Sequence, residues 1–321
     1  MFNRLFWIWV LPWVVAASLL NARTADPFGP SFAATYEEII RTFSNLMVQY
    51  PGAIRKRVLI QTPEKRELAI YSLGNEKARR RTLLLCNHHG DEQWVAQLCL
   101  DFVKFILWSK EDDLLVTEIL RDSVVDVLPL GNPDGFAKKD RFNSRHVDIN
   151  RNFPFMWGYL EPGTVNPNPG PFAMSEPETK ALHDYQKEYD GQWIVVLNYH
   201  LRYPNSDGQN YILTPWAYTR KKTLTEAEME HYSVFLPSKT EAPTFKVDTV
   251  PNVFYPCSGV HTDWSYNAFG APALTMELGH GYDLPSRDLY LRKHLKGENL
   301  PVFLRFLKGV RETLKNTPHD S

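Results

Sequence analysis

The 321-residue sequence has only three cysteines and no surplus of basic residues. Three cysteines cannot cross-link a disulfide-rich scaffold, and a chain of this length can build a hydrophobic core without one. The 36 lysines and arginines are balanced by 37 aspartates and glutamates, so the overall charge would not drive sequence-independent binding to nucleic acid. These shortages exclude a disulfide-rich miniprotein and a DNA-coating protein. With 43% hydrophobic residues, the composition is typical of a globular protein.

An apolar run, Leu5–Leu20, lies near the start of the sequence behind a single basic residue, Arg4. It is interrupted by Pro12 and is shorter than the stretch of about 20 apolar residues that a membrane-spanning helix needs. Small residues follow it, as they do at signal-peptide cleavage sites. We therefore expect residues 1–22 to be a secretory signal peptide, cleaved between residues 17 and 25; the alternatives are a retained anchor or a buried helix. The protein would be secreted or periplasmic and would meet a membrane only during export.

After this segment the sequence shows no internal repeat, no low-complexity linker and no change that marks a domain boundary. Residues 28–315 are therefore expected to form a single domain, which is a suitable size for one α/β fold. The first helix is expected near Thr35. This leaves too little chain after the signal peptide for a folded pro-segment, so we expect no pro-domain.

Short apolar runs alternate with longer amphipathic stretches along this domain. The runs predict strands at Arg57–Ile60, Leu68–Leu73, Thr82–Cys86, Val124–Leu130, Trp193–Asn198 and Ala273–Leu278. The other stretches predict helices at Thr35–Tyr50, Glu92–Trp108 and Arg292–Leu314, and a capping box of Ser175 and Glu178 that opens a helix at Glu176–Tyr189. The alternation predicts an α/β fold with a mixed, mostly parallel central sheet and helices on both faces.

Three potential metal ligands follow two of the predicted strands. His89 and Glu92 come just after the strand that ends at Cys86, and His200 comes just after the strand that ends at Asn198. Open α/β sheets bind their ligands at the carboxyl ends of the strands. Two histidines and one glutamate leave a zinc ion one open position, as catalysis requires. The His-x-x-Glu pattern alone is a weak signal, because the same residues can cap a helix.

Further segments make the sequence resemble the M14 zinc metallocarboxypeptidases, the family of carboxypeptidase A. The matching segments are Asn132-Pro133-Asp134-Gly135 (NPDG), Asp148-Ile149-Asn150-Arg151-Asn152-Phe153 (D-x-N-R-N-[FW]) and the run of Tyr255, Ser258-Gly259, Asp263-Trp264 and Glu277 (Y-x-x-S-G…D-W…E). They follow the family's order within residues 35–310. The resemblance implies the family's fold and a zinc-dependent peptidase, a hydrolase that removes the last residue of a peptide.

The resemblance also implies which residues carry out catalysis. His89, Glu92 and His200 would bind one zinc ion per chain, and Asp148 would orient His89. Glu277 would be the general base, which takes a proton from a zinc-activated water and later delivers it to the leaving amine.

An arginine is expected to stabilise the oxyanion that develops during hydrolysis. Arg141 lies seven residues before Asp148, which is the offset in the family's short-spaced members. Arg145 is the competing candidate, and we favour Arg141.

Substrate recognition is implied in the same way. Asn150 and Arg151 would grip the terminal carboxylate, since a guanidinium group matches carboxylate geometry. Tyr255 would close over that carboxylate, and Thr262 would form the floor of the pocket for the terminal side chain. The expected partner is a peptide with a free C-terminal carboxylate, and no nucleic acid is expected to bind.

Two positions depart from the family pattern and bear on specificity. His200 is followed by Leu201 and Arg202, whereas the family often has a serine after the ligand. Thr262 is neither a large aliphatic residue nor an acid, which gives no support for bulky apolar or basic terminal residues. We hypothesise a small or polar terminal residue, such as a cell-wall peptide end, with Arg202 attracting a second carboxylate. Strong preference for peptides ending in lysine or phenylalanine, over alanine and diaminopimelate, would reject this hypothesis.

Two other classes of function remain open at this point. One is an M14-like amidohydrolase, either a deacylase or a peptidase that trims peptidoglycan peptides. Deacylases are not expected to share the run from Tyr255 to Trp264 or to carry a secretory signal. The other is a non-catalytic, carboxylate-binding pseudoenzyme, although such proteins usually lack a metal ligand or the base.

The remaining candidates for chemistry have simpler interpretations. Cys86, Cys99 and Cys257 are expected to pack as small apolar residues. One disulfide is compatible with an oxidising compartment, but the sequence does not choose the pair. His88, next to a predicted ligand, is expected to be a surface residue or a supporting contact.

Overall fold

The computed structural model describes residues 27–29, 31–159, 168–202, 208–215, 226–279 and 285–316. The expected signal peptide at residues 1–22 lies outside these residues. None of the described helices is both long enough and apolar enough to cross a membrane.

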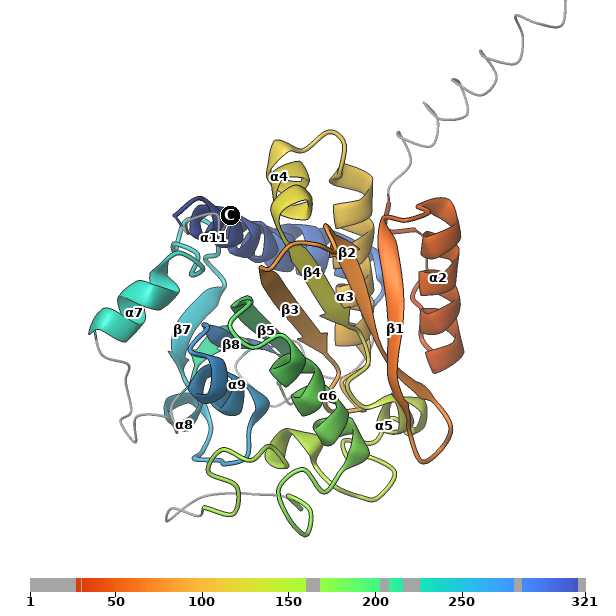
Figure 1. Ribbon diagram of the computed structural model, residues 1–321, viewed down its shortest axis with the longest axis vertical. Helices are drawn as coiled ribbons and strands as arrows, with labels where there is room; N and C mark the ends of the chain where they lie inside the picture. Colours follow the sequence, from red (N-terminus) through yellow and green to blue (C-terminus); the bar gives the residue numbers. More distant parts are fainter. Residues whose placement is uncertain are drawn as a thin grey trace, which may run out of the picture.

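An eight-stranded mixed sheet forms the centre of the molecule (Figure 1). Its spatial order is β1-β2-β4-β3-β5-β8-β6-β7. The strands are β1 (Ile54–Gln61), β2 (Glu67–Gly74), β3 (Arg81–Cys86), β4 (Val124–Leu128), β5 (Trp193–Leu201), β6 (Asn210–Thr214), β7 (Phe245–Thr249) and β8 (Ala273–Leu278). The four central strands β4, β3, β5 and β8 are parallel, whereas β2 and β6 pair with them antiparallel.

Helices pack against both faces of this sheet (Figure 1). The described helices are α2 (Tyr36–Gln49), α3 (Gln93–Ser109), α4 (Leu114–Asp122), α5 (Pro133–Lys138), η1 (Ile149–Arg151), α6 (Pro177–Glu188), α7 (Glu226–Ser233), α8 (Val250–Val253), α9 (His261–Phe269), α10 (Arg287–Leu289), the π-helix η2 (Tyr290–Asn299) and α11 (Leu300–Asn316). The α/β fold, with its mixed central sheet covered on both faces, is confirmed.

Side chains of the central strands alternate between two hydrophobic cores. In β3, Leu84 and Cys86 belong to the core that includes α2, α3, α4 and α11. Leu83 and Leu85 point the opposite way, into the core that contains Leu182 of α6 and other apolar residues of α6 and α9. Because a strand turns alternate residues to opposite faces, a continuous apolar run can serve both cores. The strand is buried along its whole length.

All six predicted strands are present, but two more were missed. Strands β6 and β7 lie between the predicted strands Trp193–Asn198 and Ala273–Leu278, where the sequence predicted no element. The described helices α4, α5 and α9 were also not predicted. These elements are short, so each carries little hydrophobic periodicity of its own.

The predicted capping box at Ser175 and Glu178 is wrong. The N-cap of α6 is Glu176, which makes no side-chain capping bond, and Pro177 is in the first turn of the helix. The hydroxyl of Ser175 instead donates to the Glu176 carboxylate at 2.8 Å. Proline is favoured at the first helical position, since its fixed φ suits the helix and it has no N–H to leave unpaired. Pro177 therefore begins the helix two residues after the predicted cap, and the N-cap moves from Ser175 to Glu176.

The predicted final helix, Arg292–Leu314, is divided. A π-helix occupies Tyr290–Asn299 and an α-helix begins at Leu300. Pro301 lies at this junction. A proline has no N–H to continue the preceding hydrogen-bond ladder, so it favours the start of a new helix there.

The sheet topology determines where the site lies. Strand β5 runs to Leu201, three residues beyond its predicted end, so His200 lies within the strand and not after it. Strands β3 and β5 are parallel neighbours, so the turn after Cys86 and the last residues of β5 meet at the same edge. Strand β8 lies on the other side of β5 in parallel, with Glu277 in register with His200. The polar residues that follow the predicted strands are thereby brought together at this edge.

Candidate metal site and substrate pocket

The turn after β3 is shaped by a residue in the left-handed conformation. Asn87 has φ 59°, a conformation that asparagine tolerates better than most residues. Its buried side-chain amide donates to the carbonyl oxygens of His89 (2.9 Å) and Glu92 (3.0 Å). These bonds fold the turn so that both predicted ligands face the end of β5.

His89, Glu92 and His200 come together as one buried group. Their potential ligand atoms all lie within 4.8 Å of one another. Nδ1 of His89 lies 2.7 Å from Glu92 Oε1, Nδ1 of His200 lies 3.0 Å from Glu92 Oε2, and the two Nδ1 atoms are 3.2 Å apart. Tetrahedral ligands at zinc–ligand distances of about 2.1 Å are themselves about 3.4 Å apart. Two imidazole nitrogens and a carboxylate that converge in this way fit a zinc ion.

Asp148 holds His89 in the orientation that metal binding needs. Its Oδ1 lies 3.2 Å from His89 Nε2, so Nε2 donates and Nδ1 keeps its lone pair for the metal. Burial alone would raise the pKa of this carboxyl group, but Arg141 and His89 outweigh it and hold the pKa of Asp148 well below its usual value. The orienting role expected for Asp148 agrees with this geometry.

Arg141 and Arg145 are clearly separated by the structure. Arg141 lines the pocket beside the ligands and donates two hydrogen bonds to Asp148 Oδ2, from Nε at 3.0 Å and from Nη2 at 2.7 Å. The Arg145 side chain is 55% exposed and lies 4.0 Å from Glu176. Arg145 is not among the described residues that line the pocket. Of these two arginines, Arg141 is the one that lines the pocket beside the metal ligands.

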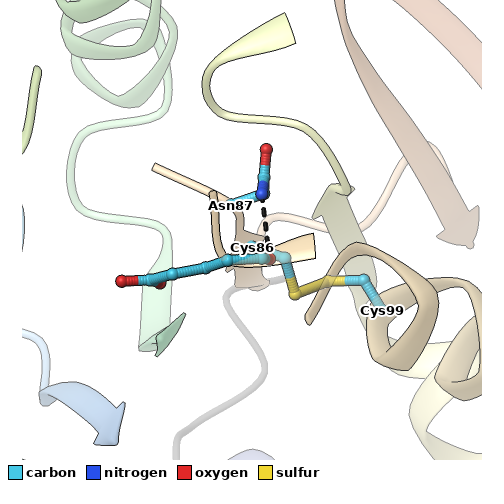
Figure 2. The surroundings of a disulfide bond; sticks show 4 residues. Cys86, Asn87 and Cys99 are labelled. Carbon is cyan, nitrogen blue, oxygen red and sulfur yellow. Dashed lines mark hydrogen bonds between the residues drawn. A yellow bond between two sulfur atoms is a disulfide. The ribbon is translucent and has the colours of Figure 1, made fainter. Parts of the chain in front are cut away.

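A disulfide connects β3 to helix α3 across the turn that carries His89 and Glu92, which is called the metal-binding turn below. Cys86 at the end of β3 is bonded to Cys99 in α3 (Figure 2). Both residues are fully buried. The structure thus contains the one disulfide that the sequence left open and identifies its pair, while Cys257 is a buried free cysteine, as expected of a small apolar residue. The bonded pair brackets His89 and Glu92 in the sequence.

The ligand group opens into a pocket of about 280 Å³. Besides His89, Glu92 and Arg141, the described residues that line it are Asn150, Arg151, Leu201, Arg202, Val250, Phe254, Tyr255, Cys257, Val260, Thr275 and Glu277. A cleft with apolar walls and a few convergent polar groups is the usual form of a small-ligand site.

The residues predicted to bind a terminal carboxylate lie together in this pocket. Arg151 donates to the backbone oxygen of Asn150 at 2.9 Å and to the Tyr255 hydroxyl at 3.4 Å. Asn150 Oδ1 accepts from the backbone N–H of His261 at 3.0 Å, which fixes the amide. Arg151 is 6% exposed. An arginine that is buried and lines a pocket can bind an anionic group there without competition from bulk water.

Thr262 lies behind the pocket wall rather than on it. Its hydroxyl is 2.9 Å from that of Thr275, and Thr275 lines the pocket together with Val260. The described lining does not include Thr262. Sequence reasoning missed both Val260 and Thr275. Thr275 could have been found, because it lies two residues before Glu277 and therefore on the same face of β8.

Glu277 projects from β8 into the pocket next to the ligand group. Desolvation, reinforced by the Glu92 carboxylate, raises the pKa of Glu277 above its ordinary value. A carboxyl group with a raised pKa is a better proton carrier near neutral pH than an ordinary glutamate.

His88 is buried and not at the surface, so the surface interpretation is wrong. Its ring packs 6.0 Å from that of His200 and 5.4 Å from that of His261. Its Nδ1 lies 3.0 Å from the Asn198 amide. Burial and the neighbouring histidines hold the pKa of His88 well below its ordinary value. His88 is therefore a neutral supporting residue behind the ligands.

Comparison with known proteins gives one consistent result. The family model for zinc carboxypeptidase matches residues 39–293. Carboxypeptidase O from Bos taurus is 26% identical over 308 residues, which cover 87% of this chain and 78% of that protein. Zinc carboxypeptidase from Simulium vittatum is 25% identical, with 79% of this chain and 90% of that protein covered.

Other relatives are much longer than the chain. Human carboxypeptidase D is 24% identical over 76% of this chain but only 18% of its own length. Among solved structures, thrombin activatable fibrinolysis inhibitor superposes with a TM-score of 0.74 at 18% identity, covering 92% of this chain and 78% of that one. Carboxypeptidase A from Helicoverpa armigera superposes with a TM-score of 0.70 at 18% identity, covering 95% and 81%. These superpositions show the fold.

Proposed function

The chain belongs to the zinc carboxypeptidase family, and from this premise we propose that it removes the C-terminal residue of peptides by hydrolysis. The observation that carries the proposal is the placement of a carboxylate-binding group directly beside the metal ligands. Arg151, Asn150 and Tyr255 line the same pocket as His89 and Glu92. A peptide held by its terminal carboxylate at the first three would present its last peptide bond to the metal site.

His89, Glu92 and His200 would hold the zinc ion of this family. Zinc in such a site acts as a Lewis acid and lowers the pKa of a bound water to about 7. Asp148 keeps the His89 ring in the metal-binding orientation. The backbone N–H of Leu201 donates to Glu92 Oε2 at 3.1 Å, which fixes the Glu92 carboxylate.

The pocket residues would divide the hydrolysis between them. Glu277 accepts a proton from the attacking water while the oxygen of that water bonds to the carbonyl carbon of the substrate. Arg141 faces the oxyanion that forms on the carbonyl oxygen and stabilises it. Glu277 then donates the proton to the leaving nitrogen as the C–N bond breaks. One water is consumed, and the products are a shortened peptide and a free amino acid.

The first test is zinc-dependent release of a terminal amino acid. The purified protein is assayed for zinc content and incubated with peptides that have free C-termini, with and without a chelator. The proposal is supported if the protein contains one zinc ion per chain and releases the terminal amino acid. The chelator should abolish this release, and added zinc should restore it. A protein that binds zinc and peptide but releases no amino acid is a pseudoenzyme, and release of acyl groups but not of terminal residues indicates a deacylase.

We also propose that the protein is exported, with residues 1–22 as the signal peptide. The disulfide between Cys86 and Cys99 supports an oxidising compartment, because such bonds are rare where glutathione keeps thiols reduced. N-terminal sequencing of the protein after expression in its own cells tests this proposal. A mature protein that begins at residue 1 and stays in the cytosol would contradict it.

A further inference from the structure

Arg202 is a third cation in the pocket that the proposed reaction does not use. It directly follows β5, and its backbone N–H donates to the carbonyl oxygen of Leu278 at 2.9 Å. Alternate residues of an extended chain share a face, so Arg202 is expected on the same side as the ligand His200. It is 9% exposed and lines the pocket with Arg141 and Arg151.

Two aromatic rings hold the Arg202 guanidinium at the pocket. Its central carbon lies 4.8 Å from the centre of the Tyr211 ring and 5.1 Å from that of Phe254. One Nη1–H group donates to the carbonyl oxygen of Gln209 at 2.9 Å. A planar, weakly hydrated guanidinium stacks well on aromatic faces while its edge stays available for hydrogen bonds. The charge is thus pre-oriented rather than carried on a free side chain.

The two aromatic residues of this stack are each next to a proposed functional residue. Tyr211 in β6 is in register with Glu277 in β8. Phe254 directly precedes Tyr255, the residue expected to close over the substrate. The Arg202 guanidinium therefore lies between the strand that carries the general base and the segment that carries the tyrosine.

The charges of the pocket favour an anionic substrate. Its described lining contains Arg141, Arg151 and Arg202, together with the carboxylates of Glu92 and Glu277. Asp148 pairs with Arg141, and the charge of Arg202 also acts on Glu277. Glu92 is assigned to the metal, which itself adds positive charge. Arg151 is assigned to the terminal carboxylate of the substrate, and Arg141 to the oxyanion. Arg202 lines the pocket but has no task in the proposed hydrolysis, and a second substrate carboxylate would complement its charge.

We propose that Arg202 is a specificity residue that binds a second carboxylate of the substrate, the acidic side chain of its terminal or penultimate residue. This inference rests on the proposed carboxypeptidase function and adds the class of peptide that it acts on. Glutamate or aspartate at one of these two positions is favoured, and lysine or arginine there is disfavoured by repulsion.

Matched peptide pairs test the inference in the zinc-loaded protein. For the terminal position, acyl-glycyl-glutamate is compared with acyl-glycyl-glutamine. For the penultimate position, acyl-glutamyl-alanine is compared with acyl-glutaminyl-alanine. We expect kcat/KM to be about tenfold higher for the acidic member of one pair, with the ratio falling as salt is added. The pair that shows the preference identifies which side chain Arg202 contacts.

Three variants assign this preference to Arg202. Arg202→Gln should bring the acidic-to-amide ratio to about one, while Arg202→Lys should retain part of it because the charge is kept. Lys246→Gln is the matched control. The Nζ atom of Lys246 also lies near the Tyr211 ring, 6.0 Å from its centre, but Lys246 is not among the described residues that line the pocket. Lys246→Gln should keep the full ratio. Because each ratio is measured on one protein sample, a partial loss of folded protein cancels.

The outcomes separate this inference from the proposed function. Hydrolysis of the neutral peptides with no acidic preference in the wild-type protein overturns the inference alone. An acidic preference that persists in Arg202→Gln also overturns it, even if Arg202→Lys behaves as expected. Failure to hydrolyse any of the four peptides counts against both.

Discussion

Glu277 and Arg141 face the same substrate pocket, and each is held for a different task. Glu277 lies on a central strand in register with a metal ligand, and its desolvated carboxyl group has a raised pKa. Arg141 is kept in place by its ion pair with Asp148 at 2.7 Å. Neither side chain is a predicted metal ligand, so each can be replaced while the three ligands stay in place.

Replacing Glu277 by glutamine should remove activity without removing the metal. The amide cannot accept the proton of the attacking water, so kcat should fall by about 10²–10⁴-fold. Zinc content and thermal unfolding of Glu277→Gln should match those of the wild-type protein. Undiminished kcat in a variant that still holds zinc would show that another group is the base.

Replacing Arg141 should lower kcat, whereas the same change at Arg145 should not. Loss of one oxyanion-stabilising group typically costs about 10²–10³-fold in kcat. Arg145→Gln is the matched control because that side chain is more than half exposed and outside the pocket. Steady-state kinetics of Arg141→Gln and Arg145→Gln decide between the two arginines. A larger loss at Arg145 would reverse the assignment.

Among the helices, α3 is bonded to the segment that precedes the metal ligands, and α6 is bonded to the segment between Arg141 and Asp148, by interactions that the sequence pattern did not reveal. Helix α3 carries Cys99, which is bonded to Cys86 across the metal-binding turn (Figure 2). Near the start of α6, Glu178 is 2% exposed and accepts a hydrogen bond from Asn143 at 3.2 Å. The disulfide should affect the free energy of unfolding, and the buried Glu178 carboxyl group should affect how that free energy depends on pH.

Removing the disulfide should loosen the metal-binding turn. Cross-linking a loop of this size stabilises a protein by about 3 kcal/mol, because the unfolded chain is restricted. We expect Cys86→Ala/Cys99→Ala to lower the free energy of unfolding and to weaken zinc binding, since His89 and Glu92 lie within the closed loop. Urea denaturation and competition with a zinc chelator measure the two effects. Unchanged zinc affinity in a destabilised variant would limit the bond to a structural role.

Glu178 should make stability depend on pH. Burial raises its pKa to about 7 from an ordinary value of 4.5, so the folded protein binds a proton that the unfolded chain releases. Stability from this group is present below about pH 4.5 and is lost as pH rises through about 7. Glu178→Gln should therefore gain about 1–3 kcal/mol relative to wild type at pH 8 compared with pH 4.5.

The control for this effect is on the same helix. Glu188 is half exposed, and its hydrogen bond to Arg57 lowers its pKa, so Glu188→Gln should not reproduce the gain at high pH. Urea denaturation at pH 4.5 and pH 8 gives the comparison. Equal pH dependence in wild type and Glu178→Gln would show that this carboxyl group is not protonated in the folded protein.

At the scale of the whole molecule, most of the sheet and the metal ligands were predictable, because both depend on short-range signals. A continuous apolar run such as β3 marks a buried strand, and a ligand that follows such a strand must reach the carboxyl edge of the sheet. His89, Glu92 and His200 therefore met as expected.

The pocket wall was less predictable, because it depends on packing between distant segments. Val260 and Phe254 come from a stretch with no regular periodicity, and their position on the wall follows from how α8 lies beside β7 and α9 beside β8. Thr262 was expected there but lies one layer behind, in contact with Thr275. The disulfide could not be assigned either, since spacing alone does not tell which two of three cysteines approach each other.

Carboxypeptidase activity is tested most directly by giving the zinc-loaded protein the same peptides with a free and with an amidated C-terminus. Arg151 and Asn150 are proposed to bind a terminal carboxylate, so amidation should reduce kcat/KM by about 10²-fold or more, as the loss of a buried charge partner does. Release of the terminal residue from the free acids alone is the result that we predict. Equal cleavage of both kinds of peptide would contradict the central claim that this protein is a carboxypeptidase.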